Sequence, residues 1–197
     1  MDIHDMKEGW GRYFPVVGIA AAIIAATAGF EWWMGRSLFG PDGKPGLWES
    51  DIWSNECSQR IADAYSFSHI GHGLVFYGLL WLVARRVPVR FRLLIAVVVE
   101  AGWEMLENSP IIIGRYREVT MALGYCGDSI LNSASDILMM CFGFILAWRL
   151  PVLASVALFV AMEVGCALWV RDNLTLNVIM LVHPVEAIKT WQMGGHP

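Results

Sequence analysis

The sequence predicts an all-α integral membrane protein, with five transmembrane helices and a C-terminal interfacial helix in a single polytopic domain over residues 1–197. Hydrophobic residues make up 56% of the chain and charged residues only 16%, whereas soluble domains contain about 25% charged residues. The ten tryptophans suit a membrane–water interface, where the indole ring is apolar and its N–H is polar. The net charge of -4 and the lack of a basic stripe in the sequence argue against nucleic-acid binding.

Apolar runs long enough to cross a bilayer recur along the chain, since a transmembrane helix needs about 20 residues. The expected spans cover residues 14–34, 67–87, 91–112, 128–150 and 151–170. Near the N-terminus, the segment Ala26-Thr27-Ala28 resembles a signal-peptide cleavage site. The apolar run continues past it through Trp32, Trp33 and Met34, which favours an uncleaved helix.

The segments between the spans differ in character. Residues 35–66 are rich in glycine, proline and polar side chains, which predicts a solvated loop with a short helix over 55–66. A second loop is expected over 113–126. In the tail 171–197, the apolar stretch 174–182 is too short to span, so we expect an interfacial or re-entrant helix there.

The arginines between the second and third spans set the orientation, because short basic loops stay in the cytoplasm. They are Arg85, Arg86, Arg90 and Arg92. The N-terminus is then cytoplasmic, whereas the loops 35–66 and 113–126 and the C-terminal tail are periplasmic, as in a multi-pass protein of the bacterial inner membrane. Arg115 and Arg117 do not follow this rule, so either the rule is weak here or they have another role. Cys57 and Cys126 would face the oxidising compartment, where a disulfide is an open alternative.

Ionisable and amide side chains gather on three of the expected spans, although charge inside a bilayer is costly. Within each span their spacing places them on one helical face, and most of them fall in the outer half of the membrane. The residues are His69 and His72 in the second span, Glu100, Glu104 and Glu107 in the third, and Asp128, Asn132 and Asp136 in the fourth.

Imidazoles beside carboxylates are a ligand set for a divalent metal such as zinc or manganese, which makes His69 and His72 the candidate metal ligands. Glu104, Glu107 and Asp128 are the candidate catalytic residues, because a metal can activate water while a spare carboxylate acts as base.

Binding candidates lie next to these residues. Arg115 and Arg117, with Arg60, are candidates to hold a phosphate, and Asn108 and Asn132 are further binding candidates. These groups favour an envelope or lipid-directed enzyme whose polar site lies near the periplasmic face, with membrane lipids as partners.

Two other functions remain open. The same polar groups can pair across helices and only fix their packing, as in a non-enzymatic assembly or structural subunit. Alternatively, Glu100 and Glu107 can serve a proton-coupled carrier. Glu31 and Glu163 stand alone in their spans, and we expect them to pair structurally.

Several motifs resemble those of a known family. They are Ser68-His69-Ile70-Gly71-His72-Gly73, Trp103-Glu104-Met105-Leu106-Glu107-Asn108-Ser109, Arg115-Tyr116-Arg117, Gly127-Asp128-Ser129-Ile130-Leu131-Asn132-Ser133 and Arg171-Asp172-Asn173-Leu174-Thr175-Leu176-Asn177. On these, nearly the whole chain resembles a bacterial membrane family catalogued as domain-of-unknown-function family 2585, or uncharacterised protein family 0314. The resemblance implies an alphaproteobacterial inner-membrane protein and implies no activity.

A second pattern, over roughly residues 68–147, resembles VanZ-like membrane proteins. The shared order is His72 with Phe76, then Glu104 or Glu107, then Arg115, then Asp128-x-x-x-Asn132. Asn108 and Ser133 stand where that family usually has Gln and Gly. This resemblance implies a link to glycopeptide resistance and cell-envelope processes.

Overall fold

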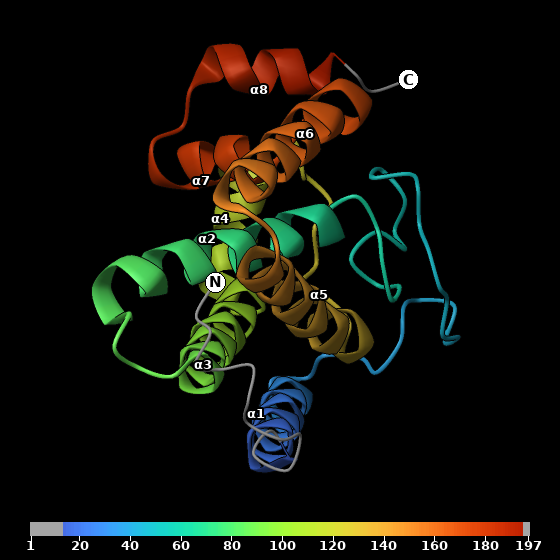
Figure 1. Ribbon diagram of the computed structural model, residues 1–197. Coiled ribbons are helices and arrows are strands. Elements are labelled where there is room, and N and C mark those ends of the chain that lie inside the picture. The colour runs from blue at the N-terminus through green and yellow to red at the C-terminus, as the bar shows by residue number, and fades with distance from the viewer. Residues whose placement is uncertain (1–13, 195–197) are drawn as a thin grey trace.

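The computed structural model describes residues 14–194 and confirms the all-α class (Figure 1). Within these residues the chain forms helices joined by loops and no β-strand. The helices are α1 (Phe14–Trp33), α2 (Ser66–Ala84), α3 (Val89–Glu107), α4 (Pro110–Val119), α5 (Ile130–Arg149), α6 (Val152–Val170), α7 (Leu174–Val182) and α8 (Glu186–Met193).

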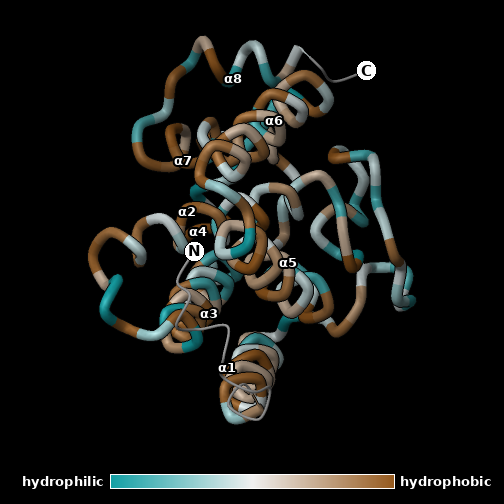
Figure 2. The backbone as a smooth tube through the Cα atoms, in the orientation of Figure 1, coloured by the Kyte–Doolittle hydropathy of each residue, from teal (hydrophilic) through white to brown (hydrophobic). Residues whose placement is uncertain are grey.

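Four helices in the described part of the chain are long and apolar enough to cross a membrane, namely α1, α2, α5 and α6. Only 6% of the apolar window of α6 is buried inside the protein, and Leu153 and Leu168 on this helix are more than four-fifths exposed. Figure 2 shows the apolar character of α1 and α6, with hydrophilic residues more frequent in the connections. So large an exposed apolar surface is typical of contact with lipid.

The third expected span differs from the structure, because residues 91–112 do not form one helix. α3 ends at Glu107, and α4 begins at Pro110. The residue before a proline is disfavoured in helical conformation, and Ser109 is extended, with its Oγ accepting a hydrogen bond from Ile112 N at 3.4 Å as an N-cap. Residues 113–119, which we expected in a loop over 113–126, therefore form the end of α4.

One further expectation is wrong, and another is confirmed but incomplete. The short helix expected over 55–66 is absent: residues 55–59 form consecutive turns, and helical structure starts only at Ser66. Conversely, residues 174–182 do form a helix, but a further helix, α8, follows it. Cys57 and Cys126 are both free thiols in the structure.

The loop over residues 35–65 is fastened to the start of α5. The amide of Ile130 donates to Ser37 O at 2.9 Å, and the amide of Ser129 donates to Ser58 O at 3.0 Å. Gln59 Nε2 donates to Gly127 O at 2.8 Å. These bonds place the end of α1, the start of α2 and the start of α5 at one polar end of the molecule.

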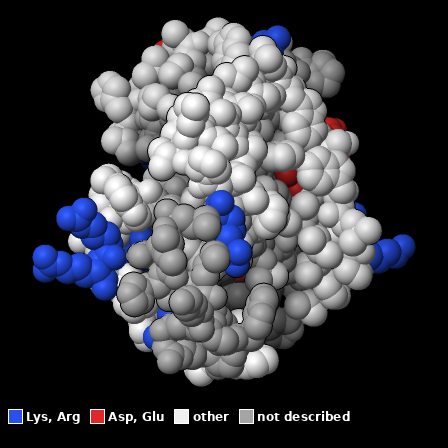
Figure 3. Space-filling view, viewed as in Figure 1, with Lys and Arg blue, Asp and Glu red and all other residues white. Residues whose placement is uncertain are grey.

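The links at residues 85–88 and 150–151 lie at the other ends of α2 and α5. A helix of 19 residues, such as α2, is about 28 Å long at 1.5 Å per residue. Figure 3 shows basic side chains at the left edge of the molecule, where the α2–α3 link lies in Figure 1. The exposed Arg85 and Arg86 belong to this link.

Close packing of α2 on α5 forms the centre of the fold. A Cβ added to Gly73 would lie 2.0 Å from Met140 O, and one added to Gly143 would lie 2.0 Å from Ile70 O. The two glycines therefore allow the helix backbones to touch. Beside this contact, Ala96 and Val97 of α3 belong to the same buried apolar cluster as Met140.

Candidate functional site

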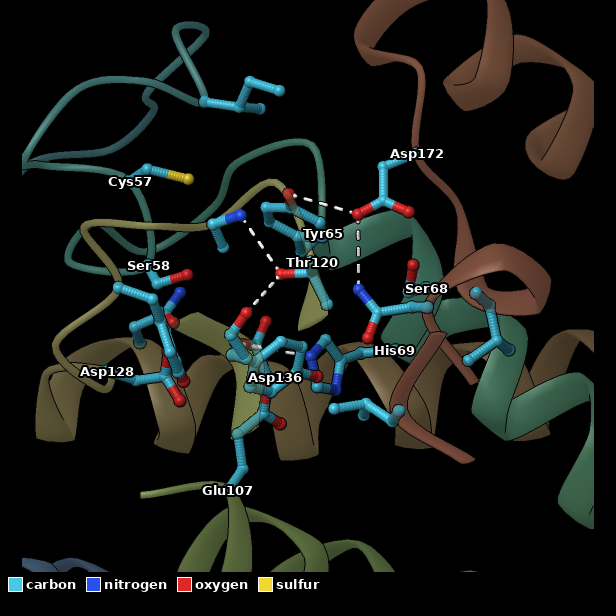
Figure 4. Close-up of a pocket in the computed structure, with 18 of the residues that line it drawn as sticks. Cys57, Ser58, Tyr65, Ser68, His69, Glu107, Thr120, Asp128, Asp136 and Asp172 are labelled. Atoms are coloured by element: carbon cyan, nitrogen blue, oxygen red, sulfur yellow. Dashed lines mark hydrogen bonds and ion pairs between the residues drawn. The ribbon is translucent and has the colours of Figure 1, made fainter. Parts of the chain in front are cut away.

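A cavity of about 710 Å³ lies beside the α2–α5 contact. Its wall is formed by residues of α2, α3, α5 and α7, and by the segments 52–58 and 120–126. Pockets of about 300–1,000 Å³ are the size that binds small organic ligands. Figure 4 shows the side chains that reach into this space from several elements.

The imidazoles of α2 meet a carboxylate of α3 in the wall of the cavity. His69 and His72 are spaced i, i+3, so both rings lie on the same face of the helix. His69 Nδ1 lies 2.7 Å from Glu100 Oε1, and His72 Nδ1 lies 2.9 Å from the same oxygen. Glu100 is fully buried, and His72 is partly exposed.

Two more carboxylates surround His69. Glu104, one turn after Glu100, places Oε1 3.5 Å from His69 Nδ1. Asp136 of α5 places Oδ2 3.7 Å from His69 Nε2, and Figure 4 shows the Asp136 and His69 side chains close together. Both carboxylates are buried.

Three of the four oxygens of these two carboxylates lack hydrogen-bond donors. Within residues 14–194, both oxygens of Glu104 and Oδ1 of Asp136 receive no hydrogen bond. A buried acceptor left unsatisfied costs about 1–3 kcal/mol, and more when it is charged. Carboxylates held this close repel each other unless a proton or a cation lies between them.

The cluster contains two overlapping groups with the geometry of a metal site. His69, His72 and Glu100 form one group, and His69, Glu104 and Asp136 form the other; in each, the ligand atoms lie within 4.8 Å of one another. Nitrogen and carboxylate ligands of this kind suit zinc or manganese. The donor set therefore fits a divalent cation.

Asp128 belongs to a separate, well-satisfied network at the start of α5. Its carboxylate accepts hydrogen bonds from Tyr125 Oη at 2.9 Å and from Asn108 Nδ2 at 3.1 Å. Asn108 Oδ1 in turn accepts from the amide of Asp128 at 2.7 Å, and its Nδ2 also donates to Ser133 Oγ. Asp128 lines the cavity without joining the histidine cluster.

The remaining residues expected at the site lie in two places. Glu107 lines the cavity, as does Asn132, whose Nδ2 donates to Arg60 O at 2.9 Å. Arg115 lies outside the cavity wall and donates to Leu181 O at 3.2 and 3.1 Å. Arg117 Nε donates to Tyr125 O.

Arg60, the third arginine considered for phosphate binding, is also engaged elsewhere. Its guanidinium lies 2.9 Å from Asp42 Oδ2 and 3.2 Å from Glu56 Oε2. The hydrogen bonds of Arg115 and Arg117 fasten α4 to α7 and to the segment 120–126.

Comparison with known proteins identifies a family but no activity. Residues 31–194 match a family described as protein of unknown function (DUF2585). The chain belongs to this family. It is 53% identical over 181 residues to a UPF0314 protein of Sphingopyxis alaskensis, covering 90% of this chain and 94% of that protein.

Two further UPF0314 proteins show how far the similarity extends. The relative from Rhizobium etli (strain CIAT 652) is 51% identical over 173 residues, which cover 88% of this chain and 89% of that protein. The relative from Agrobacterium fabrum is 45% identical over 192 residues, which cover 98% of this chain and 97% of that protein. No solved structure matches the chain.

In this DUF2585 protein, Glu100 and Asp136 were expected on the polar faces but without a catalytic or metal-binding role, and Asp172 was not expected near the site. Glu100 and Asp136 lie on the same helical faces as candidate residues, and this spacing was the feature of the sequence that could have placed them in the site. Asp172 carried no such signal, because its partners come from distant segments. It accepts hydrogen bonds from Tyr65 Oη at 3.4 Å and Gln192 Nε2 at 3.0 Å.

Asp172 lies just beyond α6 and ties the C-terminal segment to the start of α2. Asn177 Nδ2 and the amide of Asn173 also donate to its carboxylate. Burial raises the pKa of Asp172 to about 7, although these hydrogen bonds oppose the shift. In Figure 4, Asp172 and Tyr65 lie apart from Asp136 and Glu107.

Proposed function

We propose that this DUF2585 protein is a lipid-directed enzyme of the bacterial cell envelope that holds a divalent metal at its histidine cluster. The observation that supports it best is the pair of buried acids beside His69, Glu104 and Asp136, in which three of the four carboxylate oxygens lack hydrogen-bond donors. In a packing role, only protons could relieve the repulsion between these carboxylates. A bound cation would relieve it and also bind the oxygens that lack donors.

The cavity gives this cluster access to a substrate. His69, His72, Glu100 and Asp136 contribute to the cavity wall, whereas Glu104 lies behind it. A metal here would lower the pKa of a bound water and polarise an ester or related bond. We propose Glu107, which also lines the cavity, as the base that would accept a proton from an attacking water.

We also propose that α3 is a fifth membrane span and that the polar end faces the periplasm. α3 falls short of the apolarity of the other spans because it carries charged residues, but Arg92, Glu100 and Glu104 are buried in protein rather than in lipid. α3 starts at the basic link and returns to Asn108, which contacts Asp128 at the polar end. Five crossings satisfy this geometry and the positive-inside rule.

Metal binding tests the enzyme proposal directly. Protein purified in detergent, stripped with a chelator and reloaded with zinc or manganese should hold metal stoichiometrically. His72→Ala and Glu104→Gln should each lose most of this metal, as measured by mass spectrometry of the elements. His183→Ala is the matched control, because His183 is an exposed residue after α7, and it should keep the metal.

Two results would refute the metal site. One is reloaded wild-type protein, still folded, that holds no stoichiometric metal. The other is full retention of metal in the double variant His69→Ala, His72→Ala.

A non-enzymatic packing role is favoured by one observation, the Asp128 network. Asp128 and Asn108 satisfy each other and bind Tyr125 and Ser133, as expected of groups that fix helix packing. On this alternative, the histidine cluster would also act only as a structural element, and metal would be absent from it.

A further inference from the structure

We infer that the cavity binds a membrane lipid whose head group is uncharged and rich in hydroxyls, with its chain leaving between α2, α3 and α7. The inference rests on the proposed function, because it names the substrate class of the same site. It is supported by three features of the cavity wall: its charge, its hydrogen-bonding groups and its apolar rim.

The charge of the wall disfavours an anionic head group. The acidic residues that line the cavity are Glu100, Glu107, Asp128, Asp136 and Asp172. Among the described residues that line it there is no lysine or arginine. Cationic or N–H donors favour phosphate binding, whereas the five carboxylates of this wall repel an anion, and one divalent ion at the histidine cluster would offset only part of that repulsion.

The nearby arginines do not change this balance. Arg115 binds Leu181 O, and Arg117 binds Tyr125 O. Arg60 pairs with Asp42. Each guanidinium is held by these partners and none belongs to the cavity wall, so none of them provides a phosphate subsite there.

The polar groups of the wall match hydroxyls instead. Ser58 and Ser68 contribute side-chain hydroxyls. Thr120 and Asn177 also line the cavity, where the Thr120 hydroxyl donates to Tyr116 O and Asn177 Nδ2 donates to Asp172, so they offer their remaining hydrogen-bonding capacity. These groups both donate and accept, whereas the carboxylates only accept when they are ionised. A head group that offers many O–H donors can satisfy the excess of acceptors without bringing charge into the cavity.

The rim on the side of α2, α3 and α7 is apolar and open. Val75 of α2, Val99 of α3 and Val178 of α7 line the cavity and are 38%, 50% and 52% exposed. Phe76 and Trp103 also line the cavity. Apolar side chains exposed around a cavity mouth suit an alkyl chain that reaches the surrounding bilayer.

Photo-crosslinking in nanodiscs tests the head-group preference. Three lipids carry the same chains and a diazirine on the chain, and they differ only in a glucosyl, an ammonium or a phosphate head. Crosslinks are mapped by peptide mass spectrometry to residues 174–182. Crosslinks to the outer face of α6, at Leu153 and Leu168, serve as the internal reference for the local concentration of each lipid.

After this correction, the glucosyl lipid should label residues 174–182 about tenfold more than the phosphate lipid, the ratio that about 1.4 kcal/mol of preference gives. Val178→Trp should narrow the mouth and reduce the labelling, whereas Leu153→Trp on the outer face of α6 should leave it unchanged. Equal or stronger labelling by the phosphate lipid overturns the inference. Stronger labelling by the ammonium lipid than by the glucosyl lipid also overturns it, because charge would then outweigh hydroxyl recognition.

The experiment separates this inference from the metal proposal. Labelling is measured on chelator-stripped and on metal-loaded protein, and metal content is measured without added lipid. A head-group preference in protein that binds no metal would overturn the enzyme proposal but keep the lipid site. Stoichiometric metal binding without any preference among the lipids would overturn the lipid inference and leave the enzyme proposal in place.

Discussion

Gly73 of α2 and Gly143 of α5 lie so close to the partner helix that neither position has room for a side chain. Each would place a Cβ 2.0 Å from a backbone oxygen of the other helix. His69 lies one turn before Gly73, and Asp136 lies two turns before Gly143. The backbone contact therefore sets the 3.7 Å separation between the imidazole and the carboxylate.

Replacing either glycine by alanine should destabilise the protein and disturb the site together. Gly73→Ala and Gly143→Ala should each lower the unfolding free energy by about 1–3 kcal/mol, the usual cost of overpacking. Unfolding by denaturant in detergent measures this. Gly78→Ala is the control, because a Cβ at Gly78 of α2 meets no atom within 4 Å, and alanine there should be neutral or slightly stabilising.

The donor-less oxygens of Glu104 lead to a prediction that distinguishes a functional from a structural role. Glu104→Met should raise the unfolding free energy of metal-free protein by about 1–3 kcal/mol, because two buried carboxyl oxygens without hydrogen-bond donors are replaced by an apolar side chain of similar length. The same substitution should abolish metal binding. A gain in stability with a loss of binding marks a residue that is retained for function.

Asp128→Asn is the matched comparison for Glu104→Met. Asp128 accepts from Tyr125 and Asn108, so its change should lower the unfolding free energy by about 1–2 kcal/mol. If Glu104→Met lowers the unfolding free energy as well, the histidine cluster is a packing element and the alternative function gains support.

Helical periodicity was sufficient to predict much of this fold and part of the site. Apolar runs predicted α1, α2, α5 and α6 as candidate spans, because burial in lipid leaves a continuous signal in sequence. The i, i+3 and i, i+4 spacings placed the histidines and the glutamates of α3 on shared faces. Those faces do meet, as the distances from His69 to Glu100 and Asp136 show.

What the sequence could not predict depends on contacts between distant segments. The break before Pro110 carried a local signal that hydropathy masked. In contrast, the partners of Arg115 and Arg117 are backbone carbonyls, which leave no pattern of residue types. Asp172 draws its donors from Tyr65 and Gln192, at separations of 107 and 20 residues, so only the folded chain shows that it is buried.

The number of crossings can be tested by thiol labelling in intact cells. Cys126 is exposed, so a variant with the other three cysteines changed to alanine reports its side of the membrane. If α3 crosses, an impermeant maleimide should label Cys126 and a His183→Cys variant from the periplasm, but an Arg85→Cys variant only after lysis. With only four crossings, Cys126 and the thiol introduced by His183→Cys would both be protected until lysis.

Asp172 predicts a dependence of stability on pH. Burial raises its pKa from 3.8 to about 7 in the folded chain, so between pH 4 and pH 7 the unfolded chain ionises this group while the folded chain keeps the proton. The unfolded state then binds fewer protons, and the linkage relation makes stability fall as pH rises through this window, by at most roughly 4 kcal/mol. Above the folded pKa the two states ionise alike and the loss stops.

Asp172→Asn mimics the protonated acid and should flatten this part of the curve of unfolding free energy against pH. Asp42→Asn is the control of opposite sign, because the hydrogen bond from Arg60 lowers the pKa of exposed Asp42. That bond stabilises the fold at pH values above the usual carboxyl pKa and its contribution is lost only at lower pH, so Asp42→Asn should have a small effect that leaves the slope between pH 4 and pH 7 unchanged. If the slope between pH 4 and pH 7 is the same in Asp172→Asn as in the wild type, Asp172 is ionised in the folded protein, and its four donors outweigh its burial.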